Sequence, residues 1–408
     1  ARVCHSPTGF GLKTTLGESA GTQTFASVAE ADVVVVMGAN PTEAHPVFGS
    51  RLKRRLREGA KLIVIDPRKI ELVSSPHIRA DYHLPVRPGT NVVVLNALAH
   101  VIVNESLEAR DYIIDRCDVA EFEKYAQNGI DAVLINTNTD PSLLARLVPI
   151  AEKAGLEVHA WIMAINRPGD KEAEKHPEWY AVSRDGKSCF DQPPYVGYYK
   201  WMCPTRKESR DHVLSLVAGL AKVSGVASVH LDYIRYSDIY LPVGLLPKYN
   251  LVQDTELPEF DFCYCEVCVA EFQEKYHRNP LEMVHPEIDI EWKQFRLNKV
   301  KSIVDAAYDI AHKNNKMLTA AVFPYPEMAD HMVRQRWDKW NIDAVLPMIY
   351  NSFYNEGVDW IGFATAQGVN DLKGKGVGLH TGVYVPPMSA AEVGLAISEA
   401  QNNGANGV

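Results

Sequence analysis

Residues 226–236 read VASVHLDYIRY, a mostly apolar run that ends with the acidic residue Asp232 near a cluster of tyrosines. A run that is apolar on both faces is typical of a strand buried inside a parallel sheet. Runs of the same kind recur along the chain, at 129–138, 156–166, 316–326, 342–352 and 376–385. Segments with helical patterns lie between them, at 140–155, 210–225 and 292–315.

These repeats amount to at least six strand–helix units over about 280 residues, and a (β/α)8 barrel needs roughly 250 residues. We therefore predict a TIM barrel over residues 126–408 that lacks its first strand and is truncated at the last. A long irregular segment, roughly 237–290, follows the strand at 226–236. Barrel enzymes build their active-site loops at such places.

The first part of the chain alternates strands and helices in a different pattern. Strands are predicted at 31–41 and 61–69, and helices at 46–60 and 91–107. This order is typical of a doubly wound, Rossmann-like unit, which binds nucleotides at the loops after its strands. The Gly-x-Gly-x-x-Gly fingerprint is absent, which argues against an ordinary NAD site. We expect the seam between the two units at 118–130.

Composition narrows the classes of partner. The chain has 408 residues, of which 46% are hydrophobic and 23% charged, and its formal net charge is −9. An acidic balance argues against nucleic acid or an anionic membrane as a partner. No apolar run approaches the ~18 residues of a membrane span, and no signal peptide is recognisable. Seven cysteines, an odd and scattered set, argue against a disulfide framework.

Two acidic residues are candidates for catalysis in the barrel. Glycoside hydrolysis needs one protonated and one ionised carboxyl group. Asp232 ends a buried strand, where an unpaired carboxylate is costly unless it faces the barrel mouth. Arg235 would keep it ionised, or would form a merely structural ion pair with it. Glu327 follows the next strand, in a proline-rich loop where Phe323 and Tyr325 would raise its pKa as a general acid requires.

Aromatic and polar residues at the predicted strand ends favour a carbohydrate-binding cleft. Aromatic faces stack on sugar rings, while polar edges orient sugar hydroxyls. Core packing is the alternative interpretation for any one of these residues. The predicted substrate-binding residues are His159, Trp161, Asn166, Tyr233, Arg235, Tyr236, Tyr350 and His380.

The stretch CYCEVC (263–268) is a candidate metal site. Cys263, Cys265 and Cys268 can place three thiolates around a tetrahedral metal ion at ~2.3 Å. We predict structural zinc, with the fourth ligand left open among Cys203, Cys189 and a histidine such as His277. A disulfide with leftover thiols is the alternative.

The first ~125 residues resemble the catalytic alpha subunit of molybdopterin-dependent formate dehydrogenases. The motifs that carry this resemblance are ARVCHSPTGFGL (1–12), ADVVVVMGANPTEAHPV (31–47), GAKLIVIDPRK (59–69), HLPVRPGTNVVVLNALAHVIV (83–103) and DRCDVAEFE (115–123). The resemblance implies that Cys4 ligates molybdenum and that His5 handles the proton beside it. A soft thiolate suits that metal.

The same resemblance implies a bound molybdopterin guanine dinucleotide and electron-transfer subunits as partners. The cofactor-binding residues it implies are Gly38, Asn40, Asp66, Arg68, Gly89, Thr90 and Asn91. Small residues let backbone N–H groups approach phosphates, while Arg68 would clamp a phosphate or Asp66 a guanine edge. The family's iron–sulfur cysteines and the second half of its cofactor cradle are missing from this sequence. We therefore do not expect this piece alone to hold molybdenum.

The remaining ~280 residues resemble bacterial glycosyl hydrolase-like barrel proteins distantly related to family 10 glycosidases. The motifs are GIDAVLINTNTDP (129–141), AGLEVHAWIMAINRPG (154–169), VHLDYIRY (229–236), LPMIYNSFY (346–354) and GANGV (404–408). We interpret the chain as a fusion of two partial genes, with residues 1–125 from the oxidoreductase.

The function expected from this interpretation is hydrolysis of a carbohydrate by Asp232 and Glu327. Formate oxidation at Cys4 and His5, and a carbohydrate-binding barrel without catalysis, are the alternatives. The spacing of the two carboxyl groups would separate hydrolysis from binding alone. The compartment stays open, because the oxidoreductase family implies the cytoplasm and the barrel's relatives imply export.

Overall fold

The computed structural model describes residue 12 and residues 24–75, 78–105, 107, 109 and 121–408. The chain divides into two compact units, Ala1–Glu108 and Ala109–Val408. Cys4 and His5 lie outside the described residues.

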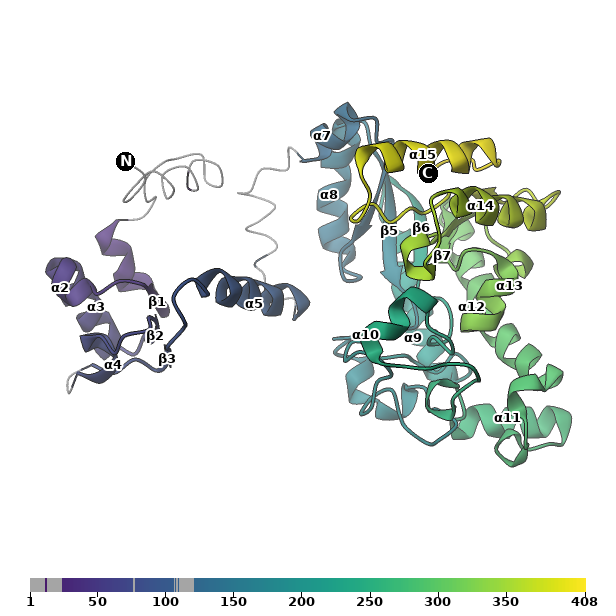
Figure 1. Ribbon diagram of the computed structural model, residues 1–408, viewed down its shortest axis with the longest axis horizontal. Coiled ribbons are helices and arrows are strands. Elements are labelled where there is room, and N and C mark those ends of the chain that lie inside the picture. Colours follow the sequence, from purple (N-terminus) through teal and green to yellow (C-terminus); the bar gives the residue numbers. More distant parts are fainter. Residues whose placement is uncertain (1–11, 13–23, 76–77, 106, 108, 110–120) are drawn as a thin grey trace. The chain divides into compact units, whose positions relative to one another are not determined.

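The first unit is a small parallel sheet with helices between its strands (Figure 1). The strands β1 (Val33–Met37), β2 (Lys61–Ile65) and β3 (Tyr82–Leu84) lie in that order and run parallel. Its remaining elements are the 3-10 helix η1 (Phe25–Glu30) and the helices α2 (Pro41–Ala44), α3 (Pro46–Arg57), α4 (Glu71–Ser74) and α5 (Asn91–Asn104). The predicted doubly wound pattern is confirmed.

Apolar side chains from the sheet and from α3 form the core of this unit. Leu52 of α3 packs with Leu62 and Val64 of β2 and with Val36 of β1. Strand β3 was not predicted, because it has only three residues and polar His83 lies at its centre. Short edge strands of this kind carry too little apolar pattern to be recognised.

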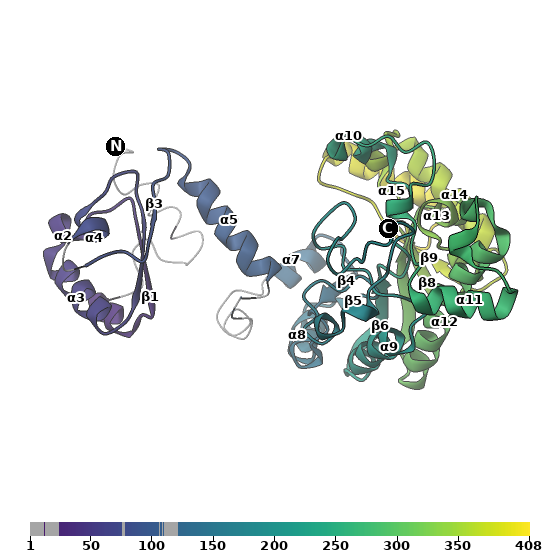
Figure 2. The same ribbon diagram turned by 90° about the horizontal axis from the view of Figure 1, so that it is seen from below.

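The second unit is a parallel β/α barrel fold (Figures 1 and 2). Its strands are β4 (Ala132–Asn136), β5 (Glu157–Met163), β6 (Val226–Asp232), β7 (Met317–Val322), β8 (Ala344–Pro347) and β9 (Gly378–Leu379), paired in that order. Each lies within one of the six predicted runs. Its longer helices are α7 (Glu121–Gln127), α8 (Pro141–Lys153), α9 (Lys207–Ala221), α12 (Ile290–Lys313), α14 (Asp359–Leu372) and α15 (Ala390–Asn402).

The helices cover the outer side of the sheet: α8 packs on β5, α9 on β6 and α12 on β7 (Figure 2). Within the described residues the six strands form an open sheet with β4 and β9 at its edges. A further parallel bridge joins His380, just after β9, to Gly407. Phe122 and Ala126 of α7 pack against the core of this unit. The predicted seam at 118–130 lies C-terminal to the division at residues 108 and 109.

Two long connections follow β5 and β6 at their carboxyl ends. The first holds the 3-10 helices η2 (Ala173–Lys175) and η3 (Pro177–Trp179), and the second holds η4 (Val243–Leu245), α10 (Leu246–Tyr249), η5 (Pro258–Phe260), α11 (Glu266–Tyr276), η6 (Pro280–Glu282) and η7 (Pro286–Ile288). The later connections hold α13 (Pro326–Val333), η8 (Trp337–Lys339) and η9 (Asn351–Tyr354). Only the second long connection was predicted.

The two long connections pair with each other through an antiparallel bridge between Ser183 and Phe262. A second antiparallel bridge, between Asn166 and Trp201, joins the start of the first connection, just beyond β5, to its later part. The connections are thereby fixed over the carboxyl ends of the strands. Among the described residues, none of the helices is both long and apolar enough to cross a membrane.

Candidate active site and four-cysteine cluster

Asp232 is the last residue of β6, and its carboxyl group is held by two donors. The Trp161 indole donates a hydrogen bond to Oδ2 at 3.2 Å, and the backbone N–H of Tyr233 donates to Oδ1 at 2.7 Å. Burial raises the pKa of Asp232, and the Tyr233 N–H, the Arg235 charge and the Trp161 bond only partly oppose it. The carboxyl group therefore favours its protonated form more than an exposed aspartate does.

Arg235 does not act as the sequence suggested. Its Nη1 donates to Asp238 Oδ2 at 3.1 Å and to the carbonyl oxygen of Tyr236 at 2.8 Å. Its guanidinium lies over the rings of Trp201 and Phe323, 4.9 Å from each centroid. Its charge lowers the pKa of Asp232, but burial outweighs that charge. The expectation that Arg235 keeps Asp232 ionised is corrected, because its hydrogen-bonded partner is Asp238.

Glu327 lies in the first turn of α13 instead of a loop, and its side chain is exposed. The predicted shielding of this carboxyl group by Phe323 and Tyr325 is therefore corrected. Its charge raises the pKa values of Arg336 and Asp371 among its neighbours. Its pairing with Asp232 stays a prediction.

Tyr350 is the aromatic residue beyond β8 that lies near Asp232. Burial raises the pKa of Tyr350 to about 12, and the nearby Asp232 charge adds to the increase. Its ring lies 5.5 Å from those of Phe353 and Tyr384. These three rings form an aromatic group, of which Tyr350 is the member near Asp232. Trp161 also contacts Asp232, through the hydrogen bond described above.

Asn166 is buried three residues beyond β5, and neither its Oδ1 nor its Nδ2 has a hydrogen-bond partner. Its bridge partner Trp201 is also buried, and the indole Nε1 likewise lacks a partner. Buried polar atoms are rarely left unpaired in folded proteins. These atoms can therefore form hydrogen bonds with a hydroxyl group of a ligand or with an ordered water molecule, the two nitrogen atoms as donors and Oδ1 as an acceptor.

Two other predicted substrate-binding residues, His159 and Tyr236, lie away from the strand ends, whereas His380 directly follows β9. His159 is the third residue of β5, and its Nδ1 lies 2.7 Å from Ser228 Oγ of β6. Burial lowers the pKa of His159, and the charge of His380 adds to the decrease while that of Glu157 opposes it. Tyr236 is only 2% exposed, and burial and the neighbouring thiol groups raise its pKa. The expected location of His159 and Tyr236 in an open cleft is corrected.

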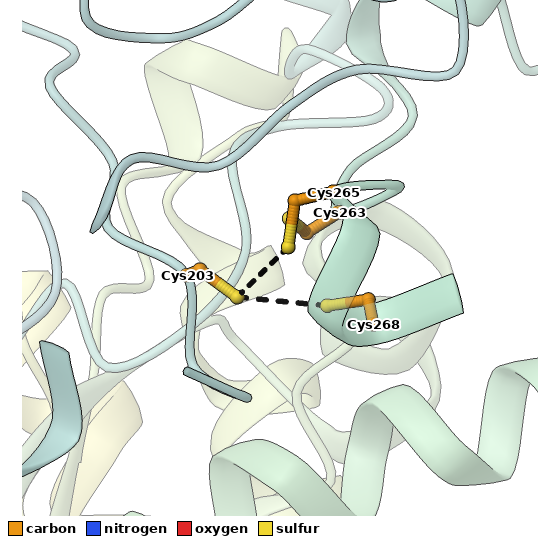
Figure 3. A group of neighbouring side chains, drawn as sticks. All are labelled: Cys203, Cys263, Cys265 and Cys268. Carbon is orange, nitrogen blue, oxygen red and sulfur yellow. Dashed lines mark hydrogen bonds between the residues drawn. The ribbon is translucent and has the colours of Figure 1, made fainter. Parts of the chain in front are cut away.

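Four buried cysteines gather between the two long connections (Figure 3). The Sγ atom of Cys203 lies 3.5 Å from those of Cys265 and Cys268, and all four Sγ atoms, including that of Cys263, lie within 4.8 Å of one another. All four thiols are free, so the alternative of a disulfide is not observed among them. Cys203 comes from the first connection, whereas Cys268 lies in α11.

Two backbone N–H groups donate hydrogen bonds to these sulfur atoms. The N–H groups of Val182 and Arg206 donate to Cys263 Sγ and Cys203 Sγ, each at 3.4 Å. The pKa of Cys265 is lowered by hydrogen bonds with Cys203 and its other two cysteine neighbours. The set can hold a metal ion by its sulfur atoms alone. Of the three candidates for the fourth position, Cys203 lies in the cluster.

The predicted cofactor residues of the first unit lie at the carboxyl ends of its strands. Gly38 follows β1 with φ +60°, and a Cβ there would meet nothing within 4 Å. Buried Asp66 follows β2 and accepts hydrogen bonds from Arg68 Nε and Nη2, both at 3.1 Å. Arg68 and Asp66 thus bind each other, which corrects the expectation that each is free for a ligand. The hydrogen bond from Arg68 lowers the pKa of Asp66.

The remaining predicted residues of this edge make local bonds. Asn40 Oδ1 accepts from Thr42 Oγ1 at 2.7 Å, and Thr90 Oγ1 donates to the Arg87 carbonyl oxygen at 2.7 Å. Gly89 has φ +88° and open space around its missing Cβ, and Asn91 begins α5. The feature of this edge that fits a nucleotide is therefore the free space beside the backbone at Gly38 and Gly89.

The aromatic residues of the first long connection were not predicted as site residues, although Asn166, Cys189 and Cys203 of this connection were. Trp201 and Tyr199 of this connection pack with Tyr233, at ring distances of 5.6 Å and 6.3 Å. The available signal was the unusual distance between the runs at 156–166 and 210–225, which leaves more than 40 residues without a predicted element.

Comparisons with known proteins agree with two separate likenesses. A family model described as molybdopterin oxidoreductase matches residues 1–336. Formate dehydrogenase H of Escherichia coli is 37% identical over 125 residues, which is 31% of this chain and 17% of that protein. The F420-dependent formate dehydrogenase 1 subunit alpha of Methanococcus maripaludis is 39% identical over 116 residues, 28% of this chain and 17% of that protein. The chain thus spans less than a fifth of these relatives.

Among solved structures, the catalytic domain of a beta-amylase from Paenibacillus polymyxa matches with a TM-score of 0.50 and 11% identity. The match covers 71% of this chain and 86% of that one. At this identity the likeness concerns the fold alone, and it supports the barrel architecture.

Proposed function

We propose that this chain, which belongs to the molybdopterin oxidoreductase family, has two functional parts. One part is a segment of that family's cofactor-binding site, and the other is a barrel that hydrolyses glycosidic bonds. The observation that carries the second part is the carboxyl group of Asp232. It lies at the carboxyl end of a barrel strand, where barrel enzymes place their chemistry. Its burial favours the protonated form, which a general acid requires.

Asp232 donates its proton to the leaving oxygen of the glycosidic bond in this proposal. Trp161 orients the carboxyl group through its indole N–H, and it stabilises the carboxylate left after proton transfer. Asn166 offers its unpartnered amide to a sugar hydroxyl, and Tyr350 offers an aromatic face. Glu327, whose side chain is exposed, is the proposed second carboxyl group and would act as the base or nucleophile. The roles first expected for the two acids are thereby exchanged.

The test is turnover of nitrophenyl glycosides and soluble polysaccharides by the full chain and two variants. Asp232→Asn should lower kcat by about 10²–10⁴-fold, the usual contribution of a general acid, and Glu327→Gln should lower it as well. The control is Asp211→Asn, since Asp211 is an exposed residue of α9 paired with Lys207. Undiminished turnover by Asp232→Asn would refute this role. Binding of a polysaccharide without turnover would favour the carbohydrate-binding alternative.

The four cysteines are proposed to hold a structural zinc ion. A tetrahedral ion with bonds of ~2.3 Å separates its sulfur ligands by about 3.8 Å. The distances of 3.5 Å from Cys203 to Cys265 and Cys268 are close to that value. Four protein ligands leave no position for substrate, which favours a structural role. Metal analysis should give one zinc per chain, lost in Cys203→Ser and kept in Cys189→Ser, because buried Cys189 lies outside the cluster.

The first unit is proposed to retain one edge of the family's pterin–guanine dinucleotide site. The open backbone at Gly38 and Gly89 fits the close approach of phosphates. The exposed guanidinium of Arg68 would turn from Asp66 to a phosphate. When bound, the group supplies molybdenum redox chemistry, and formate oxidation with electron-transfer subunits is the corresponding second function. Titration with GDP tests whether this edge of the first unit binds a guanine nucleotide, and Arg68→Ala should weaken GDP binding.

A further inference from the structure

The segment from Asp232 to Tyr236 joins the barrel mouth to the four-cysteine cluster. Asp232 ends β6 beside Trp161, whereas Tyr236 is buried in the same core as Cys203, Cys263 and Cys268. The Tyr236 hydroxyl lies 3.5 Å from the carbonyl oxygen of Arg296, whose Nη1 donates to the Phe262 carbonyl oxygen at 3.1 Å. Phe262 directly precedes Cys263. The candidate acid is therefore only four residues from Tyr236, which packs in the same core as the candidate metal centre.

Trp201 provides a second link between the two places. It lies two residues before Cys203, and its ring lies 4.9 Å from the Arg235 guanidinium and 5.6 Å from the Tyr233 ring. The backbone that links Trp201 to Cys203 is fixed, since Met202 N–H donates to the Ile165 carbonyl oxygen and Cys203 N–H to that of Trp179, each at 2.7 Å. A bond from Cys203 to a metal ion would hold this segment of the first connection in place. It would thereby also hold the Trp201 indole, which lies over the Arg235 guanidinium.

The turn at Tyr233, between Asp232 and Tyr236, is unfavourable by itself. Tyr233 has φ +51°, a left-handed conformation that residues with a side chain rarely adopt. The Tyr233 N–H, at the start of this turn, donates a hydrogen bond to Asp232 Oδ1, 2.7 Å away. Such a turn persists only where its surroundings hold it. The surroundings here are the Trp201 ring on one side and the buried Tyr236 on the other.

We propose that the four-cysteine metal centre is the anchor of the Tyr233 turn and thereby fixes the Asp232 carboxyl group at the barrel mouth. Tyr236 and Trp201 act as positioning residues that transmit this constraint. The inference rests on the metal binding proposed above and does not require that the barrel hydrolyse any particular sugar.

The test follows the titration of Asp232 directly, by NMR of full-length protein with ¹³C-labelled aspartate side chains, the signal being assigned with Asp232→Asn. Zinc-loaded protein is compared with protein stripped by a chelator. Loosening of the turn should admit water to the carboxyl group, so its midpoint should fall by about one pH unit, a tenfold change in proton affinity. Cys189→Ser, which keeps the cluster intact, should titrate like the unaltered protein.

The variant Tyr236→Leu removes the proposed link between the metal centre and the Asp232 carboxyl group without removing the metal. It therefore provides a test even if the metal-stripped protein unfolds. This variant keeps all four cysteines, so its zinc content should stay at one per chain, and its Asp232 midpoint should still fall. An unchanged midpoint in both the stripped protein and zinc-loaded Tyr236→Leu would overturn the inference and leave zinc binding standing. If the protein takes up no zinc, both this inference and the proposed zinc site are overturned. Failure of glycoside hydrolysis alone would leave the titration result unaffected.

Discussion

Removal of the hydrogen bond from Trp161 to Asp232 should raise the pKa of that carboxyl group further. In Trp161→Phe the ring remains but the indole N–H, 3.2 Å from Oδ2, is lost. A hydrogen bond to a charged group contributes about 1.5–3 kcal/mol, and a bond at the long end of the usual range belongs near 1.5 kcal/mol. Since 1.36 kcal/mol corresponds to one pKa unit, the expected increase is about one unit.

The same change predicts how stability depends on pH. Because the pKa of Asp232 is raised in the folded protein, its contribution to stability is full below the unfolded pKa of about 3.9 and is lost as pH rises through the folded pKa. Trp161→Phe extends this loss to higher pH. Its free energy of unfolding should therefore fall by about 1.5 kcal/mol more at pH values above both folded midpoints than below pH 3.9.

The assay combines urea unfolding at several pH values with the NMR titration of Asp232. Trp337→Phe is the matched control, because its buried indole donates to the carbonyl oxygen of Phe323 at 3.1 Å instead of to a carboxyl group. That variant should lose stability equally at all pH values. A midpoint in Trp161→Phe that stays in place or moves down would refute the reasoning.

Three other predictions concern buried polar groups. Asp261→Asn should lower the free energy of unfolding by about 3–5 kcal/mol in urea titrations, because it leaves the buried Arg296 charge without its ion-pair partner. Asn166→Leu should leave stability unchanged or raise it, since no partner is lost, while lowering turnover of any glycoside that the chain hydrolyses. Asp170→Asn should be destabilising at neutral pH by an amount that shrinks below about pH 4 in the same titrations. Burial opposes ionisation of Asp170, but the His212 bond and other favourable contacts outweigh it and lower its pKa.

The strands and the position of Asp232 could be predicted from the sequence, because both depend on neighbours along the chain. Apolar runs without alternation indicated six buried parallel strands, and Asp232 at the end of one such run indicated a place at the barrel mouth. The spacing of Cys263, Cys265 and Cys268 likewise indicated three thiols in one turn-rich segment. The loop expected at Glu327 was wrong because Pro326 begins a helix there, a position that proline favours.

Only the tertiary structure decided which distant groups meet. Cys203 joins cysteines that follow it by 62 and 65 residues, and Arg235 pairs with Asp238 although Asp232 lies equally close in sequence. The direction of the pKa shift at Asp232 depends on the balance between burial and the Arg235 charge. Sequence spacing reports which residues share a strand or a turn. Burial depends on how the loops after β5 and β6 cover the strand ends, and that arrangement exists only in the folded chain.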